Sequence, residues 1–390
     1  MIPGKGASLV GLRELNARAV LDVIRARAPI SRAQISREVS LTRPTVAGAI
    51  ETLLGAGLVR ETELADGLSF GATFFEPAPD AAYAVAFDID RGQCRAMLAD
   101  AAGTVVASGD AGGDSATPED LMGRAAGMTA ELCEQADVDR ARLAAGVAGV
   151  PATVGPGDGV LRMSAYRLLE GLALGHALST ALGVPVVAHN DTHLAAFAER
   201  AEGVAAGISD FAYLSVGRSA GAGVVLGGEV LRGRNGASGE IDEPADGESF
   251  LPDSPAADAF TAFAKERQDE ARRAGAAVPF SPNPTSVFAA GERGDELALA
   301  IMAEEAERIA GRAALLCRVL DVGLIVLGGG IGRNCQPLLD QIRAALARQL
   351  RFPPRVVLST LSEPPVLVGA RAIGARMALD LVTTAKLARA

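Results

Sequence analysis

The sequence has no tryptophan, three tyrosines and three histidines among 390 residues, and its four cysteines form no Cys-x-x-Cys pair. So few aromatic rings leave little material for stacking the bases of single-stranded nucleic acid. Isolated cysteines and scarce histidines argue against a disulfide framework and a zinc centre, and they fit a reducing compartment. No apolar run reaches about 18 residues, the length of a membrane span, and charges interrupt any signal-peptide core. We therefore expect a cytoplasmic protein with no membrane partner, cofactor or bound metal.

Charge is distributed unevenly along the chain. The whole sequence has 37 Lys and Arg against 47 Asp and Glu, a net charge of −10. Residues 1–60 contain nine cations and four acids, a net charge of +5, so the remaining 330 residues carry −15. A small basic segment joined to a large acidic one is typical of a protein that meets phosphate with one part only.

The basic segment has the pattern of three short helices. Apolar residues at helical spacing predict a helix over 15–28, with Val20, Val23 and Ile24 on its inward face and Leu15 and Ala19 one turn earlier. Ser31 and Gln34 have the spacing of a capping box for a second helix. Thr42 is placed to cap a third helix, because a proline follows in the first turn.

The third helix and the residues after it complete the pattern. Its expected inward residues are Val46, Ile50, Leu53 and Leu54. A strand-like alternation follows over 58–62. Three helices, a tight turn and a strand predict a winged helix-turn-helix. The alternatives are a basic helical domain that binds no nucleic acid and a winged helix that binds protein.

The helical wheel assigns a DNA-facing surface. The residues expected to contact DNA are Arg32, Thr42, Arg43, Thr45, Ala47, Gly48 and Arg60. Arg43 is the group with bidentate capacity for guanine, Ala47 suits a thymine methyl, and Gly48 permits close approach. Because this surface has few hydrogen-bond donors, we expect the wing and DNA shape to contribute to specificity.

The acidic remainder reads as two α/β halves of similar layout. In the first half we predict strands at 82–90 and 94–100 and a helix near 117–136. In the second half we predict strands at 211–217 and 323–330, a hairpin turn at Gly227–Gly228, and helices near 254–274 and 294–318. Two such halves predict a cleft, the usual place for a ligand.

These patterns predict three domains in order along the chain. We expect a DNA-binding head at 10–70, a linker at 71–80 and a body at 81–390. The body is expected to have lobes at about 81–200 and 201–370, with a C-terminal helix that returns to the first lobe.

Three segments at predicted strand ends are candidates for ligand binding. The first, VPVVAHND, delivers Asn190 and Asp191 to the start of a helix, where Asp191 could bond a hydroxyl or serve as a helix cap. The others are the glycine-rich stretches 217–223 and 328–332, which let backbone approach a ligand. Ordinary turn glycines are the alternative for both stretches.

Taken in this order, the segments resemble the ROK family of repressors, open reading frames and sugar kinases. The start of the third helix, TRPTV, resembles the xylose and N-acetylglucosamine repressor branch, and GVPVVAHNDTHLAAFAE and LRGRNGASGEI resemble the family's sugar-site segments. The resemblance implies a duplicated actin-like/hexokinase-like (ribonuclease H-like) body. It also implies sugar contacts from Asn190, Asp191 and Glu240, and from Glu243 at a histidine position of the family. In the kinases of the family, the residue at Asp191 is the general base.

Departures from the family pattern indicate that the kinase chemistry is lost. Asp90 stands where the kinases have a phosphate-binding glycine, which puts negative charge beside the triphosphate. The family's zinc segment is replaced by residues 242–248, DEPADGE, followed by a cysteine-free continuation. We therefore expect no catalytic residue and no structural zinc.

These observations predict a DNA-binding transcriptional regulator, a repressor of carbohydrate-related genes. Its degenerate sugar-kinase-like body is expected to bind a sugar or sugar-derivative effector and to form a homodimer or a dimer of dimers. The expected DNA partner is a palindromic double-stranded operator. Two alternatives are an ATP-dependent sugar kinase with a DNA-binding head, and a regulator whose body only dimerises.

Overall fold

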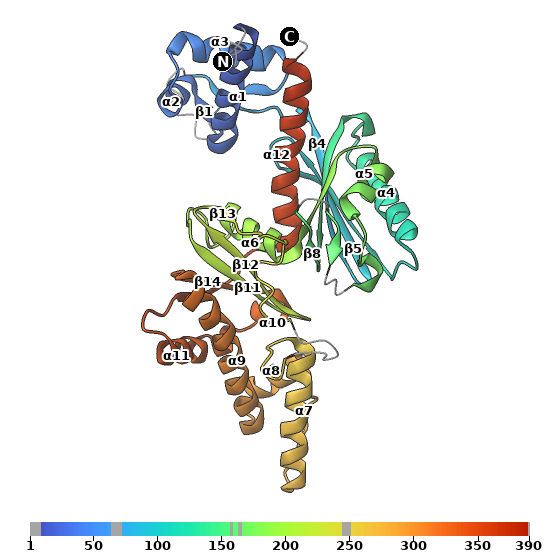
Figure 1. The fold of residues 1–390 in the computed structure, drawn as a ribbon, viewed down its shortest axis with the longest axis vertical. Coiled ribbons are helices and arrows are strands. Elements are labelled where there is room, and N and C mark those ends of the chain that lie inside the picture. The colour runs from blue at the N-terminus through green and yellow to red at the C-terminus, as the bar shows by residue number, and fades with distance from the viewer. Residues whose placement is uncertain (1–8, 64–71, 157–158, 163–165, 244–250, 389–390) are drawn as a thin grey trace, which may run out of the picture. The chain divides into compact units, whose positions relative to one another are not determined.

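The computed structural model describes residues 9–63, 72–156, 159–162, 166–243 and 251–388 (Figure 1). The chain divides into two compact units. Unit 1 comprises Met1–Val150, Tyr166–Ala188 and Ala370–Ala390, and unit 2 comprises Pro151–Ala165 and His189–Gly369. Within the described ranges, the helices are too short or too polar to cross a membrane.

The N-terminal part of unit 1, here called the head, contains three helices and a three-stranded antiparallel sheet. The helices are α1 (Leu9–Arg27), α2 (Arg32–Glu38) and α3 (Arg43–Gly55), and the strands are β1 (Ile30–Ser31), β2 (Val59–Thr62) and β3 (Phe74–Pro77). The predicted caps are present: Ser31 and Gln34 form a capping box, and Thr42 accepts from the Thr45 amide. Val46, Ile50 and Leu53 are buried as predicted, whereas Leu54 is half-buried.

Two expectations for the head are wrong. The segment 71–80 is not simply a linker, because β3 pairs with both β2 and β1, and Phe75 is fully buried. Phe75 contributes to the core of the head, a role that a short, proline-containing stretch does not indicate in the sequence. In α1, Leu15 is 61% exposed and Ala19 is exposed, because the buried stripe runs through Ala17 instead.

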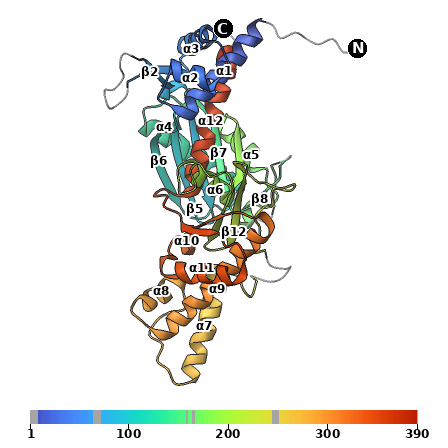
Figure 2. The same ribbon diagram turned by 90° about the vertical axis from the view of Figure 1, so that its left-hand side faces the viewer.

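The C-terminal helix α12 (Pro365–Leu387) completes the core of the head. Ala378, Leu379 and Leu387 belong to the same buried cluster as the apolar residues of α1 and α3. Polar contacts reinforce this packing. Figure 2 shows α12 alongside α1, where Arg25 pairs with Asp380 at 2.9 Å. The two ends of the chain therefore fold together.

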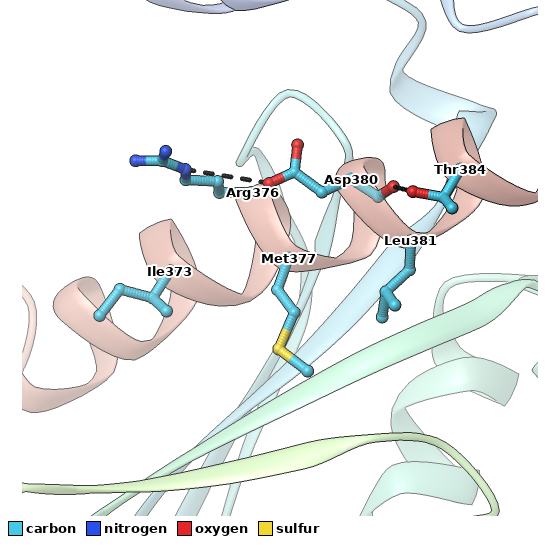
Figure 3. Close-up of a pocket in the computed structure, with 6 residues that line it drawn as sticks. All are labelled: Ile373, Arg376, Met377, Asp380, Leu381 and Thr384. Atoms are coloured by element: carbon cyan, nitrogen blue, oxygen red, sulfur yellow. Dashed lines mark hydrogen bonds and ion pairs between the residues drawn. The ribbon is translucent and has the colours of Figure 1, made fainter. Parts of the chain in front are cut away.

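A shallow groove of about 360 Å³ follows one face of α12 (Figure 3). The residues that line it are Ile373, Arg376, Met377, Asp380, Leu381 and Thr384. Thr384 also accepts a hydrogen bond from Arg18 at 3.0 Å, so the groove runs beside α1. The residues expected at the effector site do not line this groove.

The rest of unit 1 is built on a five-stranded sheet in the order β10-β7-β4-β5-β6. The strands are β4 (Tyr83–Asp90), β5 (Gln93–Asp100), β6 (Val105–Gly112), β7 (Leu143–Val150) and β10 (Val186–Asn190), which runs past the unit boundary. Helices α4 (Pro118–Gln135) and α5 (Leu174–Leu182) cover one face, and α12 lies on the other (Figure 1). Gly374 of α12 permits this approach, since a Cβ there would lie 3.2 Å from Ala84 Cβ.

Unit 2 contains a second five-stranded sheet, in the order β13-β12-β11-β14-β15. Its strands are β11 (Phe211–Val216), β12 (Ala220–Leu226), β13 (Glu229–Val230), β14 (Leu324–Gly328) and β15 (Arg355–Leu358). Gly227 and Gly228 form the predicted two-residue turn, and both have positive φ. In each sheet, three successive strands form an antiparallel meander that is joined through its first strand to two later strands, so the two sheets share one strand order.

Helices and one short hairpin surround the second sheet. The longer helices are α6 (Asp191–Ala201), α7 (Ala257–Arg273), α8 (Pro284–Glu292), α9 (Glu296–Leu320) and α11 (Leu339–Gln349). The one-turn helix α10 (Gly329–Gly332) follows β14. Strands β8 (Thr153–Val154) and β9 (Leu161–Arg162) form a hairpin outside both large sheets. The ranges predicted for α7 and α9 agree with the structure to within a few residues.

Shortening Leu379 to alanine tests whether the head depends on α12. We expect Leu379→Ala to lower the free energy of unfolding by about 2–4 kcal/mol, because it leaves a cavity in a closed core. Amide hydrogen exchange should quicken in α1 and α3. Leu381→Ala is the control on the same helix, because Leu381 is 39% exposed. Unchanged exchange in the head of the Leu379→Ala variant would contradict a shared core.

Candidate functional site

The amino end of α6 is the centre of the candidate effector site. Strand β10 ends at Asn190, whose side chain is 5% exposed and caps α6. The Asn190 Oδ1 accepts from the His193 amide at 3.1 Å and from Thr192 Oγ1 at 2.5 Å. Its Nδ2 donates to the Ala152 carbonyl at 3.2 Å and to Glu240 Oε1 at 3.3 Å. One amide side chain thus joins three separate segments.

The loop at 236–241 brings Glu240 to this helix end. The Ala222 amide donates to the Gly239 carbonyl at 2.8 Å, and His193 Nε2 lies 2.8 Å from the Ser238 carbonyl oxygen. Gly239 has φ +90°, and a Cβ there would lie 1.8 Å from the Ala222 oxygen. Glycine is therefore required for the loop to approach β12 so closely.

The charge state of the site follows from its burial. Burial raises the pKa of Glu240, the neighbouring Glu243 carboxylate raises it further, and a hydrogen bond from Thr153 lowers it. Burial also lowers the pKa of His189 to about 3 and lowers that of His193, with Arg232 acting in the same direction. Both imidazoles are therefore neutral at pH 7 and add no positive charge to the site.

The expected effector residues are brought together in part. Asn190 and Glu240 are in contact, and Asp191 is the half-buried first residue of α6, with its Oδ1 accepting from the Thr192 amide at 2.7 Å. Asn190, rather than Asp191, is the helix cap. Glu243 is an exposed residue at the edge of the described range. Partial desolvation of its carboxyl and the neighbouring Asp242 raise its pKa.

Sequence reasoning missed Thr153, Thr192 and His193. All three are contacts of the site, and Thr153 and His193 are buried. The sequence of VPVVAHNDTH already placed Thr192 and His193 in the first turn of a helix after a strand, so their proximity was available. The sequence around Thr153 does not indicate that it lies at this site. Its position depends on the contact between the β8–β9 hairpin and a loop that is distant in sequence.

A buried arginine, Arg312, binds two aspartates. Arg312 Nε donates to Asp242 at 2.8 Å, and its two terminal nitrogens donate to Asp253 at 3.0 and 2.9 Å. The side chains of Arg312 and Asp242 are 9% and 4% exposed, and Ser254 also donates to Asp242. Among the described residues, no group of three or more His, Cys, Asp or Glu is arranged for a metal ion.

The turns that would face a nucleotide have structural partners of their own. At the β4–β5 turn, Asp90 accepts from the Arg91 amide at 2.7 Å, and Arg95 pairs with Asp88 at 3.4 Å. After β14, a Cβ on Gly329 would lie 2.5 Å from the Val216 carbonyl oxygen. This glycine is therefore required by packing against β11, whether or not a ligand binds.

On the head, the expected DNA-facing residues fall into two groups. Arg32 and Arg43 are exposed and form no ion pair with the described residues, and Gly48 is exposed with open space around its Cβ position. Ala47 and Thr45 are half-buried, and the Thr45 and Thr42 hydroxyls lie 2.8 Å apart. Arg60 differs from the other arginines, because it is ion-paired with Glu76 of β3 at 2.6 Å.

Parts of this chain are similar in sequence to known proteins. A bifunctional enzyme NanE/NanK from Brucella suis is 33% identical over 199 residues, which are 50% of this chain and 36% of the enzyme. The DNA-binding transcriptional repressor Mlc of Escherichia coli is 25% identical over 235 residues, 59% of this chain and 57% of the repressor. This chain thus matches about a third of the enzyme's length and somewhat more than half of the repressor's.

A solved structure shares the fold over nearly the whole chain. The crystal structure of a ROK family transcriptional regulator, a homologue of E. coli Mlc, superimposes with a TM-score of 0.79 at 22% identity. The similarity covers 97% of this chain and 100% of that one. Likeness at this level of identity shows the fold.

The two five-stranded sheets and their common strand order define an α/β protein, and its fold is that of the ROK family transcriptional regulator described above. The sequence agrees over part of the chain, because residues 84–242 match the model of the ROK family.

Asp88 should make stability depend on pH. Burial raises its pKa from 3.8 to about 6, against the lowering effect of Arg95. A carboxyl whose pKa is raised by folding stabilises the protein below its unfolded pKa, and this contribution is lost as pH rises through the folded value. Asp88→Asn should therefore gain about 1–3 kcal/mol over the wild type between pH 4 and 6.5, and the gain should disappear below about pH 4. Chemical denaturation at each pH measures it.

The control for this experiment is Glu131→Gln, at an exposed position of α4. Its difference in stability from the wild type is measured over the same pH range. A constant difference between Asp88→Asn and wild type from pH 4 to 7 would show that Asp88 titrates normally.

Proposed function

We propose that this protein is a DNA-binding transcriptional regulator whose head is a winged helix-turn-helix. The observation that carries the proposal is the head itself, in which α3 begins with a capped turn and presents an exposed Arg43 that forms no ion pair with any described residue. The repressor names of relatives such as Mlc and the Bacillus subtilis xylose repressor agree with this function.

In the proposed complex, α3 enters the major groove of duplex DNA. Arg43 then reaches a guanine edge, and Gly48 allows the helix to lie close to the bases. Arg32 at the start of α2 contacts backbone phosphate. Arg60 must exchange its pair with Glu76 for a phosphate, so it contributes less than an unpaired arginine. Two copies of the chain occupy the half-sites of a palindromic operator.

The body supplies the effector site. Asn190, Asp191, Glu240 and Glu243 are the residues that we propose to contact a sugar or sugar derivative. The protein has one arrangement that binds DNA and one that does not. A ligand changes the affinity for DNA only if it binds these two arrangements with unequal affinity. A sugar site in the body and a DNA-binding head in the same chain together suit a repressor of carbohydrate-related genes.

A sugar kinase is the second candidate function. The retained Asp191 and the similarity to NanE/NanK favour it, because the residue at this place is the base in the kinases of the family. Asp90 opposes it, since a carboxylate at the β4–β5 turn repels a triphosphate. We propose that the chain does not phosphorylate sugars.

Footprinting on DNA upstream of the protein's own gene and its neighbours, with and without sugars, tests the regulator function. Arg43→Ala is expected to weaken binding to the protected site about 10- to 100-fold, the loss of one bidentate base contact of about 1–3 kcal/mol. The matched control is Arg140→Ala, because Arg140 is exposed on the body. Salt-insensitive binding, or equal loss with both variants, would contradict the proposed interface.

A coupled assay for ADP release decides between regulator and kinase. With ATP, magnesium and a panel of hexoses and N-acetylhexosamines, we expect turnover no faster than that of an Asp191→Asn variant. Sugar-dependent ADP release that is abolished in Asp191→Asn would establish the kinase instead.

A further inference from the structure

The β8–β9 hairpin is not part of either five-stranded sheet and contacts residues of the candidate effector site instead. Among the described residues, its two strands pair only with each other, at Thr153–Arg162 and Val154–Leu161. It follows β7 along the chain, yet it belongs to the compact unit that contains α6 and the loop at 236–241.

Three contacts seat this hairpin against the loop that carries Glu240. Asn190 donates to the Ala152 carbonyl, and the Thr153 hydroxyl is hydrogen-bonded to the Glu240 carboxylate. A Cβ on Gly236 would lie 2.0 Å from the Val154 carbonyl oxygen, so the loop and hairpin backbones meet directly. Thr153 is 3% exposed, which places its hydroxyl inside this junction.

We propose that Thr153 is a positioning residue of the effector site, where its hydroxyl and the Asn190 amide fix the Glu240 carboxylate to accept hydrogen bonds from neighbouring hydroxyls of an uncharged sugar. A carboxylate offers about four acceptor positions, so two donors from the protein leave room for two from a ligand. Holding the carboxylate before the ligand arrives reduces the ordering cost of binding.

The charges around Glu240 favour an uncharged ligand. Glu243 lies on the same loop and Asp191 on α6, whereas Asp242 is paired with Arg312 and His193 is neutral. Two arginines are also in this region: Arg232, which acts on His193, and Arg162, the residue across the hairpin from Thr153. Carboxylates predominate in this set. A phosphate or carboxylate group placed against Glu240 would meet like charge, whereas hydroxyl groups would meet acceptors.

The hydrogen bond from Thr153 favours the ionised form of Glu240. Burial and Glu243 raise the pKa of Glu240, and the hydrogen bond from Thr153 opposes both. Removing the hydroxyl therefore shifts the titration of Glu240 to higher pH. A side chain that only filled space would leave this titration unchanged, so the two roles differ in a measurable way.

The experiment compares Thr153→Val, which keeps the shape, with Thr153→Ser, which keeps the hydroxyl, in the full chain. Thr129→Val is the matched control, since Thr129 is also buried and donates to a helical carbonyl in unit 1. For each background, the unfolding midpoint is measured from pH 4 to 8 with and without Glu240→Gln. The difference between each pair of curves traces the titration of Glu240.

We expect this titration to move to higher pH in Thr153→Val and to stay in place in Thr153→Ser and Thr129→Val. Thr153→Ala, which also lacks the hydroxyl, is the second variant should Thr153→Val not fold. An unmoved titration in the variants that lack the hydroxyl overturns the proposal.

Calorimetry with D-glucose, D-xylose, N-acetyl-D-glucosamine and D-glucose 6-phosphate tests the ligand part, which rests on the proposed function. Thr153→Val should weaken binding of the uncharged sugar about 10-fold at pH 7, and Thr153→Ser should restore it. Tighter binding of the phosphate ester than of glucose overturns the choice of an uncharged ligand. If no sugar binds the wild type while the pH shift is present, the sugar-effector function fails and the hold of Thr153 on Glu240 is supported.

Discussion

The structure of the candidate site depends on how one buried amide is used. The Asn190 side-chain oxygen accepts a hydrogen bond from the first turn of α6, and its nitrogen donates to the Ala152 carbonyl and to Glu240. An aspartate here could cap the helix equally well but could not donate to either acceptor. The asparagine therefore sets the distance between α6, the β8–β9 hairpin and the acidic loop. An acceptor-rich surface beside a helix end is the result.

Two features that invite a ligand or metal interpretation in the sequence have structural roles in the body. Arg312 donates hydrogen bonds to Asp242 and Asp253. A Cβ on Gly328 would lie 2.0 Å from the Tyr213 hydroxyl oxygen, so this glycine too is required by packing. Motifs that indicate nucleotide binding by composition can thus persist for reasons of packing alone. This is why the presence of glycines there does not argue for kinase activity.

Local signals in the sequence predicted local structure well. The capping box at Ser31, the cap at Thr42 and the two-glycine turn each depend on residues within a few positions, and all are present. Tertiary contacts were harder. The inward face of α1 was misplaced at Leu15, because part of its packing partner is the C-terminal helix. The sequence did not predict the role of Thr153 either, because its partner Glu240 is distant in sequence.

The shared core of the head and α12 has a consequence for biosynthesis. Leu387 belongs to the same cluster as Val20 and Ile24, although the whole body lies between them in the sequence. Domains usually fold in order as the ribosome makes them, at about 5–20 residues per second. Here the head waits for the whole body to be translated, roughly half a minute at about 10 residues per second. A truncated chain that ends before α12 therefore leaves the ribosome without a finished head.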